Sequence, residues 1–136
     1  LSVVFASSQE SGEGDASHLT DGNPSSYWHT MYSVTVANYP HWVDFDCGGM
    51  KTIKGFTYLP RQDSNNGNIK KYSIQVSNDG KTWGKAVAEG EFENNRKEKT
   101  ILLTTPVKAR FVRLTALSEQ SGQDFATGAE FKVLEK

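Results

Sequence analysis

The sequence predicts an all-β fold, a β-sandwich, in one domain over residues 1–136. Short runs alternate between apolar and polar residues with a period of two, which is the repeat of a half-buried strand. Gly, Asn, Asp and Pro separate these runs, and segments with apolar residues at helical spacing are almost absent. Six or more short strands at this spacing are typical of a sandwich or barrel. A chain of 136 residues is long enough for one hydrophobic core and too short for two comfortable ones.

The expected elements follow along the chain. One helical turn is expected at residues 16–19, and residues 29–40 fit either a long loop or an irregular strand. The clearest strand is 72–77, where Tyr72, Ile74 and Val76 share one face. The Asp-Gly pair that follows it predicts a tight hairpin turn. Further strands are expected at residues 42–46, 53–59, 99–104, 110–116 and 130–134.

Most remaining apolar side chains have structural roles in this prediction. Trp28, Trp42 and Trp83 lie at strand edges, where we expect core or core-rim positions. Cys47 continues the alternation of Val43 and Phe45, so we expect a buried small hydrophobe and no nucleophile.

Composition excludes several classes of partner. Fifteen basic and sixteen acidic residues give a net charge of −1, so neither a nucleic acid nor an anionic membrane is an expected partner. No apolar run approaches the roughly 18 residues that a membrane span needs, which predicts a soluble module. The chain begins without an initiator Met, and we expect an excised piece of a longer protein.

The chain lacks the motifs of a catalytic site. No Gly-x-Ser-x-Gly elbow occurs, and His18, His29 and His41 are scattered. Clustered zinc ligands and phosphate-binding glycine loops are missing as well. No acid/base pair of a hydrolase stands out, so we do not expect this chain to be an enzyme.

Two polar loops admit a binding role. Residues 58–67 follow a predicted strand and carry Arg61 and Asn66, whose donors and acceptor match the neighbouring hydroxyls of a sugar. Residues 16–28 place many oxygen ligands around Gly22, as a calcium loop would. Taken alone, each loop is better explained by an ordinary turn, because Asn-Gly and Asp-Gly are strong turn dipeptides.

Five motifs nevertheless occur together and in order. They are DGNPSSYWH at 21–29, IKGFTYLPRQD at 53–63, YSIQVSNDGKTW at 72–83, ARFVRL at 109–114 and AEF at 129–131. With these motifs the chain resembles the coagulation factor 5/8 type C, or discoidin-like, domain over nearly its whole length. Within that family it is most similar to the bacterial family 32 carbohydrate-binding modules. The resemblance implies a jelly-roll β-sandwich of the galactose-binding-domain type.

The resemblance also implies a galactose site. Its residues in this chain are His29, Tyr32, Arg61, Asn66 and Phe125. The family often has Trp where this chain has Tyr32, and the loop that carries Phe125 varies in length. Galactose differs from glucose in its axial O4, which this polar set would meet, so Gal and GalNAc are the expected ligands.

A structural Ca²⁺ ion is implied in the same way. Its ligands would be the His18 carbonyl, Asp21, Asn23, Ser26, the Ala129 carbonyl and Glu130. Most members have Thr where this chain has Ser26, a change that keeps the hydroxyl group.

The implied function is binding without catalysis. The module would hold an attached glycoside hydrolase, of sialidase, galactosidase or hexosaminidase (chitobiase) type, near galactose- or GalNAc-containing glycans. A monomer at a secreted, periplasmic or cell-surface location is expected. The alternative is a cell-surface, phospholipid or protein adhesion module of the discoidin type.

Overall fold

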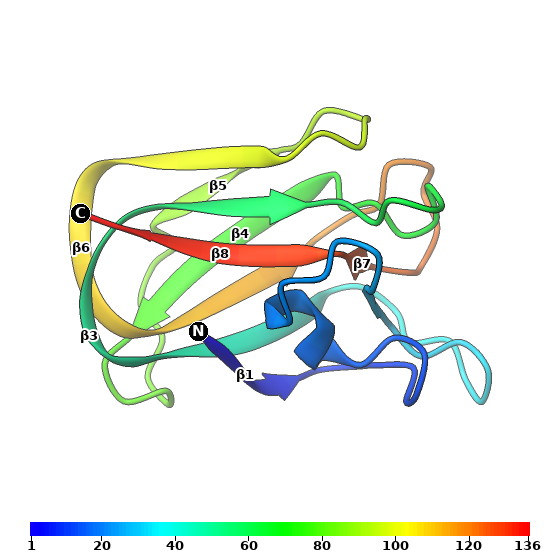
Figure 1. Ribbon diagram of the computed structural model, residues 1–136, viewed down its shortest axis with the longest axis horizontal. Helices are drawn as coiled ribbons and strands as arrows, with labels where there is room; N and C mark the ends of the chain where they lie inside the picture. Colours follow the sequence, from blue (N-terminus) through cyan, green and yellow to red (C-terminus); the bar gives the residue numbers. More distant parts are fainter.

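A computed structural model describes all residues 1–136, and it confirms the all-β prediction (Figure 1). The elements are β1 (Ser2–Ala6), the 3-10 helix η1 (Ala16–Thr20), β2 (Trp28–His29), β3 (His41–Leu59), β4 (Lys71–Ser77), β5 (Ala88–Glu91), β6 (Lys99–Ala116), β7 (Thr127–Gly128) and β8 (Glu130–Glu135). The helical turn predicted at residues 16–19 is therefore present as η1.

Two long strands build the sandwich. β3 and β6 pair antiparallel from His41↔Ala116 to Tyr58↔Lys99, with register irregularities between Asp46 and Lys51. Such bulges bend a strand, and both strands curve strongly at the left of Figure 1. The sequence predicted two strands in each of these regions. The structure instead joins each pair into one strand. In β3, Gly48, at φ +84°, lies at the bend and allows the backbone to pass through it.

The bend divides one hydrogen-bonded sheet into two layers. The first half of β3 pairs with β1, and the last part of β6 pairs with β4, which in turn pairs with β5. The second half of β3 pairs with β8 (Figure 1). The same two long strands, β3 and β6, therefore run through both layers of the sandwich.

The core lies between the layers as one cluster of 18 buried hydrophobic residues. Tyr72 and Ile74 of β4 are buried, as their alternation predicted. Phe131 of β8 stacks between Phe45 and Phe56, with ring centroids 4.7 Å and 5.9 Å away. Because these two rings lie in the two halves of β3, Phe131 links the layers.

The hairpin predicted after residue 77 is confirmed, since β4 pairs antiparallel with β5, but its connection is longer than a tight turn. Asp79 and Gly80 do turn the chain, with Asp79 Oδ1 accepting the N–H groups of Lys81 and Thr82 at 2.8 Å. The first pair between the strands is Ile74↔Ala88, so the connection spans residues 78–87. The turn satisfies its own polar groups and leads into a longer loop.

Three further sequence expectations have clear outcomes. Trp28 is buried, whereas Trp42 and Trp83 are partly exposed at the rim of the core. Cys47 is half-buried and packs on the core as a free thiol, so it is less enclosed than predicted. Residues 30–40 form an irregular loop that ends in a cis peptide bond between Tyr39 and Pro40. No helix of the structure has the length and apolar character needed to span a membrane.

Phe131→Ala is expected to lower the free energy of unfolding by about 3 to 5 kcal/mol, because it empties the contact between the two layers. Urea denaturation measures this loss. Val34→Ala is the control, since Val34 is 86% exposed and should change stability by less than about 0.5 kcal/mol. Equal effects of the two substitutions would contradict this account of the core.

Candidate functional site

The five residues proposed for sugar binding come together at one end of the sandwich. β2, the loop at 30–40, the loop after β3 and the loop before β7 meet at the right of Figure 1. Their side chains line a hollow of about 280 Å³, which also includes Glu13. The lining residues are Glu13, His29, Tyr32, Arg61, Asn66 and Phe125.

His29 presents one ring nitrogen as a hydrogen-bond acceptor. The residue is nearly buried in β2, where its backbone pairs with Thr127 of β7. Its Nδ1 lies 2.6 Å from the Thr30 carbonyl oxygen. A carbonyl oxygen only accepts, so Nδ1 carries the proton and Nε2 of the neutral ring is an acceptor.

Aromatic rings form the wall beside His29. The Tyr32 and Phe125 ring centroids lie 4.8 Å and 5.3 Å from the imidazole, and 6.4 Å from each other. Phe125 is held through its backbone, since the Tyr39 hydroxyl donates to its carbonyl at 2.6 Å. His41 Nε2 donates to the neighbouring Asp124 carbonyl at 2.6 Å. The loop therefore carries its ring on a fixed backbone.

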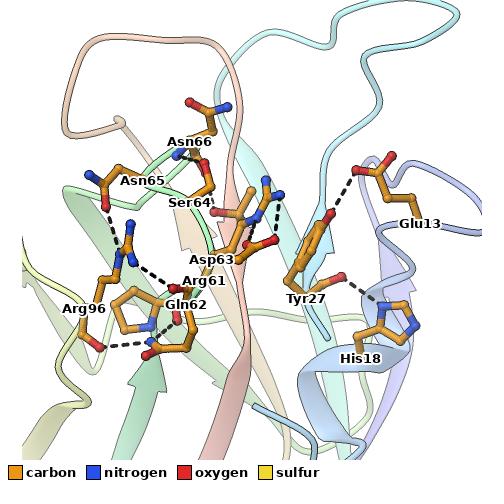
Figure 2. Close-up of polar contacts among 12 residues, drawn as sticks. Glu13, His18, Tyr27, Arg61, Gln62, Asp63, Ser64, Asn65, Asn66 and Arg96 are labelled. Atoms are coloured by element: carbon orange, nitrogen blue, oxygen red, sulfur yellow. Dashed lines mark hydrogen bonds and ion pairs between the residues drawn. The ribbon is translucent and has the colours of Figure 1, made fainter. Parts of the chain in front are cut away.

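Arg61 is held in place and still has free hydrogen-bond donors. Its Nε and Nη2 atoms donate to the Asp63 carboxylate at 2.6 Å and 3.4 Å, and its guanidinium carbon lies 3.8 Å from the Tyr27 ring centroid (Figure 2). These contacts use two of the five guanidinium N–H groups. The hydrogen bond from Arg61 lowers the pKa of Asp63, so the pair stays charged at neutral pH.

Asn66 has a fixed backbone and a free side chain. Its N–H donates to the Ser64 hydroxyl at 3.1 Å, and its carbonyl accepts the Thr127 hydroxyl at 2.8 Å. The exposed side-chain amide makes no hydrogen bond within the protein. Two donors and one acceptor are therefore available at the edge of the hollow.

Glu13 is a residue of the hollow that the sequence alone does not single out. Its Oε1 accepts the Tyr27 hydroxyl at 2.9 Å, and its Oε2 accepts the Tyr32 hydroxyl. The Tyr32 hydroxyl, followed by that of Tyr27, lowers the pKa of Glu13. The neighbouring Gly14 allows the close approach of this loop to His29, since a Cβ at Gly14 would lie 2.5 Å from His29 Cβ. The loop with Glu13 must therefore run directly against His29.

Glu10 fixes the backbone beneath Tyr32. Its Oε1 accepts the N–H groups of Tyr32 and Ser33, each at 2.9 Å, and its Oε2 accepts the Ser33 hydroxyl at 2.7 Å. These bonds, led by the one from Tyr32, lower the pKa of Glu10. Glu10 supports the site without lining the hollow.

The proposed calcium ligands also gather in space. The Ser26 hydroxyl donates to Asp21 Oδ2 and lies 3.1 Å from the Asn23 carbonyl oxygen. The Asp21 N–H donates to the His18 carbonyl at 3.4 Å. Burial raises the pKa of Asp21, but the Ser26 hydroxyl and the Asn23 N–H outweigh it, so the net shift is downward.

Glu130 brings a second carboxylate to Asp21 from across the fold. Its side chain is buried, and its Oε1 atom has no hydrogen-bond partner. Burial, followed by the nearby Asp21 carboxyl group, raises the pKa of Glu130. The structure has no cluster of three or more His, Cys, Asp or Glu residues suited to a metal. Two carboxyl groups with amide, hydroxyl and carbonyl oxygens are nevertheless the mixed oxygen set that Ca²⁺ prefers.

A hollow of about 530 Å³ on the outer face of the first layer is less suited to a polar ligand. There Arg113 forms two hydrogen bonds to Asp44, at 2.7 Å and 2.9 Å, and lies 4.5 Å from the Trp83 ring centroid. Asp79 is used by its own turn. These charged groups are already paired, in contrast to the free groups around His29.

The sequence of the chain matches a known family of protein domains. The family model of the F5/8 type C domain matches residues 4–131. A sialidase of Micromonospora viridifaciens is 40% identical over 137 residues, covering 98% of this chain and 21% of that protein. A galactose oxidase of Gibberella zeae is 35% identical over 136 residues, covering 98% of this chain and 20% of that protein. The chain thus spans about a fifth of the length of these curated relatives.

Solved structures from Clostridium perfringens are similar over most of the fold. The module CpGH89CBM32-5, in complex with GalNAc-β-1,3-galactose, is 36% identical with a TM-score of 0.87, covering 96% of this chain and 92% of that one. The family 32 module of NanJ, in complex with galactose, is 33% identical with a TM-score of 0.85, covering 95% and 90%.

The contact between Glu13 and Tyr32 makes a prediction about pH. A carboxyl group whose pKa is lowered on folding stabilises the fold above its unfolded pKa, and this contribution is lost as pH falls through the folded pKa. For Glu13 that loss lies below its ordinary value of 4.5. Tyr32→Phe should raise the pKa of Glu13, as measured by ¹³C carboxyl shifts in an NMR titration. Tyr72→Phe is the control, and equal values of the Glu13 pKa in both variants would refute the contact.

Proposed function

The chain belongs to the F5/8 type C domain family, as its resemblance predicted, and we propose that it is a non-catalytic module that binds galactose and GalNAc. The observation that carries this proposal is the convergence of an acceptor, several donors and an aromatic wall on one small hollow. His29 supplies the acceptor, and Arg61 and Asn66 supply donors.

The axial O4 of galactose fits this arrangement. A hydroxyl group donates one hydrogen bond and accepts others, so O4 donates to His29 Nε2 and accepts from the Arg61 guanidinium. The Asn66 amide serves a neighbouring hydroxyl. Glucose has an equatorial O4, which leaves these groups without that partner. The unpaired groups would cost about 1 to 3 kcal/mol, enough to set selectivity at a shallow site.

The aromatic wall suits the apolar face of the same sugar. The C–H groups of galactose lie on one side of the ring and pack on an aromatic surface. Tyr32 and Phe125 offer that surface beside His29. Tyr32 is smaller than the Trp often found at this position in the family, so we expect a weaker site of the same selectivity.

Similar modules support the proposal. Two solved relatives from C. perfringens are complexes with galactose and with GalNAc-β-1,3-galactose. Because the chain spans about a fifth of its curated relatives, we propose that it works beside a catalytic domain, such as a sialidase or another glycoside hydrolase. Tethering raises the effective concentration of the substrate, which makes even a millimolar site useful. A monomeric module on a secreted or cell-surface enzyme fits this role.

A second candidate function rests on the loop beyond Tyr32. Val34 and Val36 are 86% and 43% exposed there. Exposed apolar loop tips suit insertion into a lipid surface, as in an adhesion module of the discoidin type. Binding to anionic phospholipid vesicles in the absence of sugar would favour this candidate.

The galactose proposal is tested by NMR titration of the labelled protein with galactose and with glucose. Saturable shifts are expected with galactose, and His29→Ala and Arg61→Ala should weaken binding by about five- to 150-fold. Arg110→Ala is the matched control, because Arg110 pairs with Asp46 and does not line the hollow. Equal binding of glucose, or no shifts up to tens of millimolar galactose, would count against the proposal.

We also propose that Ca²⁺ occupies the loop at residues 18–26. The unpaired Oε1 of buried Glu130 beside Asp21 supports a cation at this position. The His18 and Ala129 carbonyls, Asn23 and Ser26 would complete the ligand set. The ion would tie the loop to β8 and would not contact the sugar.

Removal of Ca²⁺ is expected to lower the melting temperature. An ion present at 100 times its Kd stabilises the fold by about 2.7 kcal/mol, which corresponds to roughly 5 to 10 °C for a domain of this size. Calorimetry with and without EDTA measures the shift, and Glu130→Gln should abolish it. Glu135→Gln, an exposed residue on the same strand, should respond like the wild type. An unchanged melting temperature with EDTA, and no ion recovered with the protein, would refute the proposal.

A further inference from the structure

Glu119 is a buried carboxylate without a cationic partner. Glu119 is 3% exposed, and no Lys, Arg or His forms an ion pair with its carboxylate. Burial of a charged group is costly unless hydrogen bonds satisfy it. All of its partners are N–H and O–H donors, which come from two separate loops.

One carboxylate oxygen closes the loop that leads to Phe125. Glu119 Oε1 accepts the Ser121 N–H at 2.6 Å, the Ser121 hydroxyl at 2.7 Å and the Gln123 N–H at 3.0 Å. The Gly122 N–H also donates to the Glu119 carbonyl at 3.2 Å. These bonds fold residues 119–123 around a single side chain.

The other oxygen reaches the loop that carries Asn66. Glu119 Oε2 accepts the Gly67 N–H at 3.0 Å, and Gly67 directly follows Asn66. The Gly67 carbonyl accepts the Thr127 N–H at 2.9 Å, and the Asn66 carbonyl accepts the Thr127 hydroxyl at 2.8 Å. The two loops are therefore joined on both sides of Phe125.

Gly67 packs directly against Thr127 where the two loops meet. It has φ +77°, and a Cβ at this position would lie 2.6 Å from Thr127 Cγ2. Only glycine tolerates both the positive φ and the close approach. The Glu119 tether thus acts on backbone that is already in direct contact.

We propose that Glu119 is a positioning residue of the sugar site. It does not line the hollow, but it joins the loop that carries Asn66 to the loop that carries Phe125. This inference rests on the proposed galactose function. A site made of loops needs such a tether, because a displacement of about 1 Å is enough to misalign hydrogen bonds.

Glu119→Gln is expected to break the hydrogen bond to Gly67 and to keep the hydrogen bonds within residues 119–123. The glutamine side chain has one acceptor oxygen where glutamate has two. Its carbonyl can keep the three bonds to Ser121 and Gln123, which leaves the NH₂ group facing the Gly67 N–H. Two donors cannot bond to each other, so the tether to Gly67 is lost while the turn at 119–123 remains.

The experiment compares this variant with the wild type by NMR, with Ca²⁺ present and at a temperature where both are folded. We expect faster hydrogen exchange at the Gly67 amide, retained protection at Ser121 and Gln123, and a roughly tenfold weaker Kd for galactose. Gln120→Ala is the matched control. Its side chain donates to Ile69 and Phe92 at 3.2 Å and 2.8 Å, so its loss should lower stability without weakening the sugar site.

The outcomes separate this inference from the proposed function. Wild-type affinity in Glu119→Gln, or equal losses of affinity in Glu119→Gln and Gln120→Ala, would overturn the positioning role. No galactose binding by the wild type would refute the proposed function instead. In that case the Gly67 exchange rate still decides whether the tether exists, since unchanged protection in Glu119→Gln would overturn it. Should Glu119→Gln fail to fold, Glu119→Asp keeps the charge on a shorter side chain, and the same uncoupling is expected.

Discussion

The antiparallel pairing of β3 with β6 is the constraint on which the rest of the structure depends. Both strands continue through the bend, so the same pair of strands contributes to both layers. Each layer then adds its outer strands to this pair, and Phe131 fills the space between the two halves of β3. Because β3 starts and ends at the same end of the sandwich, the loops beside His41 and Leu59 are brought together there (Figure 1). The candidate sugar site is a consequence of this folded pair of strands.

The site groups are fixed before any ligand arrives. His29 is oriented by the Thr30 carbonyl, Arg61 by Asp63 and Tyr27, and the Phe125 loop by Tyr39. Such preorganisation lowers the entropy lost on binding, which matters for a shallow hollow with few contacts. The link between Glu13 and Tyr32 adds to this order through the hydroxyl group that distinguishes Tyr from Trp.

Two buried glutamates illustrate different solutions to the same electrostatic problem. Glu119 is satisfied entirely by hydrogen-bond donors from two loops. Glu130 keeps an oxygen without a partner and lies beside another carboxyl group, that of Asp21. The first arrangement is complete within the protein and holds its loops together. The second would be completed by the cation proposed above, which accounts for the different roles proposed for the two residues.

Local patterns in the sequence were enough to predict the all-β class, the inward face of β4 and the family motifs that contain His29 and Arg61. Those features depend on local alternation, turn residues and short motifs, which a chain displays in one dimension. The sequence did not reveal that residues 42–46 and 53–59 form one bent strand, nor that the hairpin after residue 77 has a long connection over residues 78–87. Only the tertiary structure placed Glu13 against Tyr32 and brought Glu119 to Gly67, because these contacts join residues 19 and 52 positions apart. Their partners are chosen by the packing of two layers, and no local pattern in the chain encodes that choice.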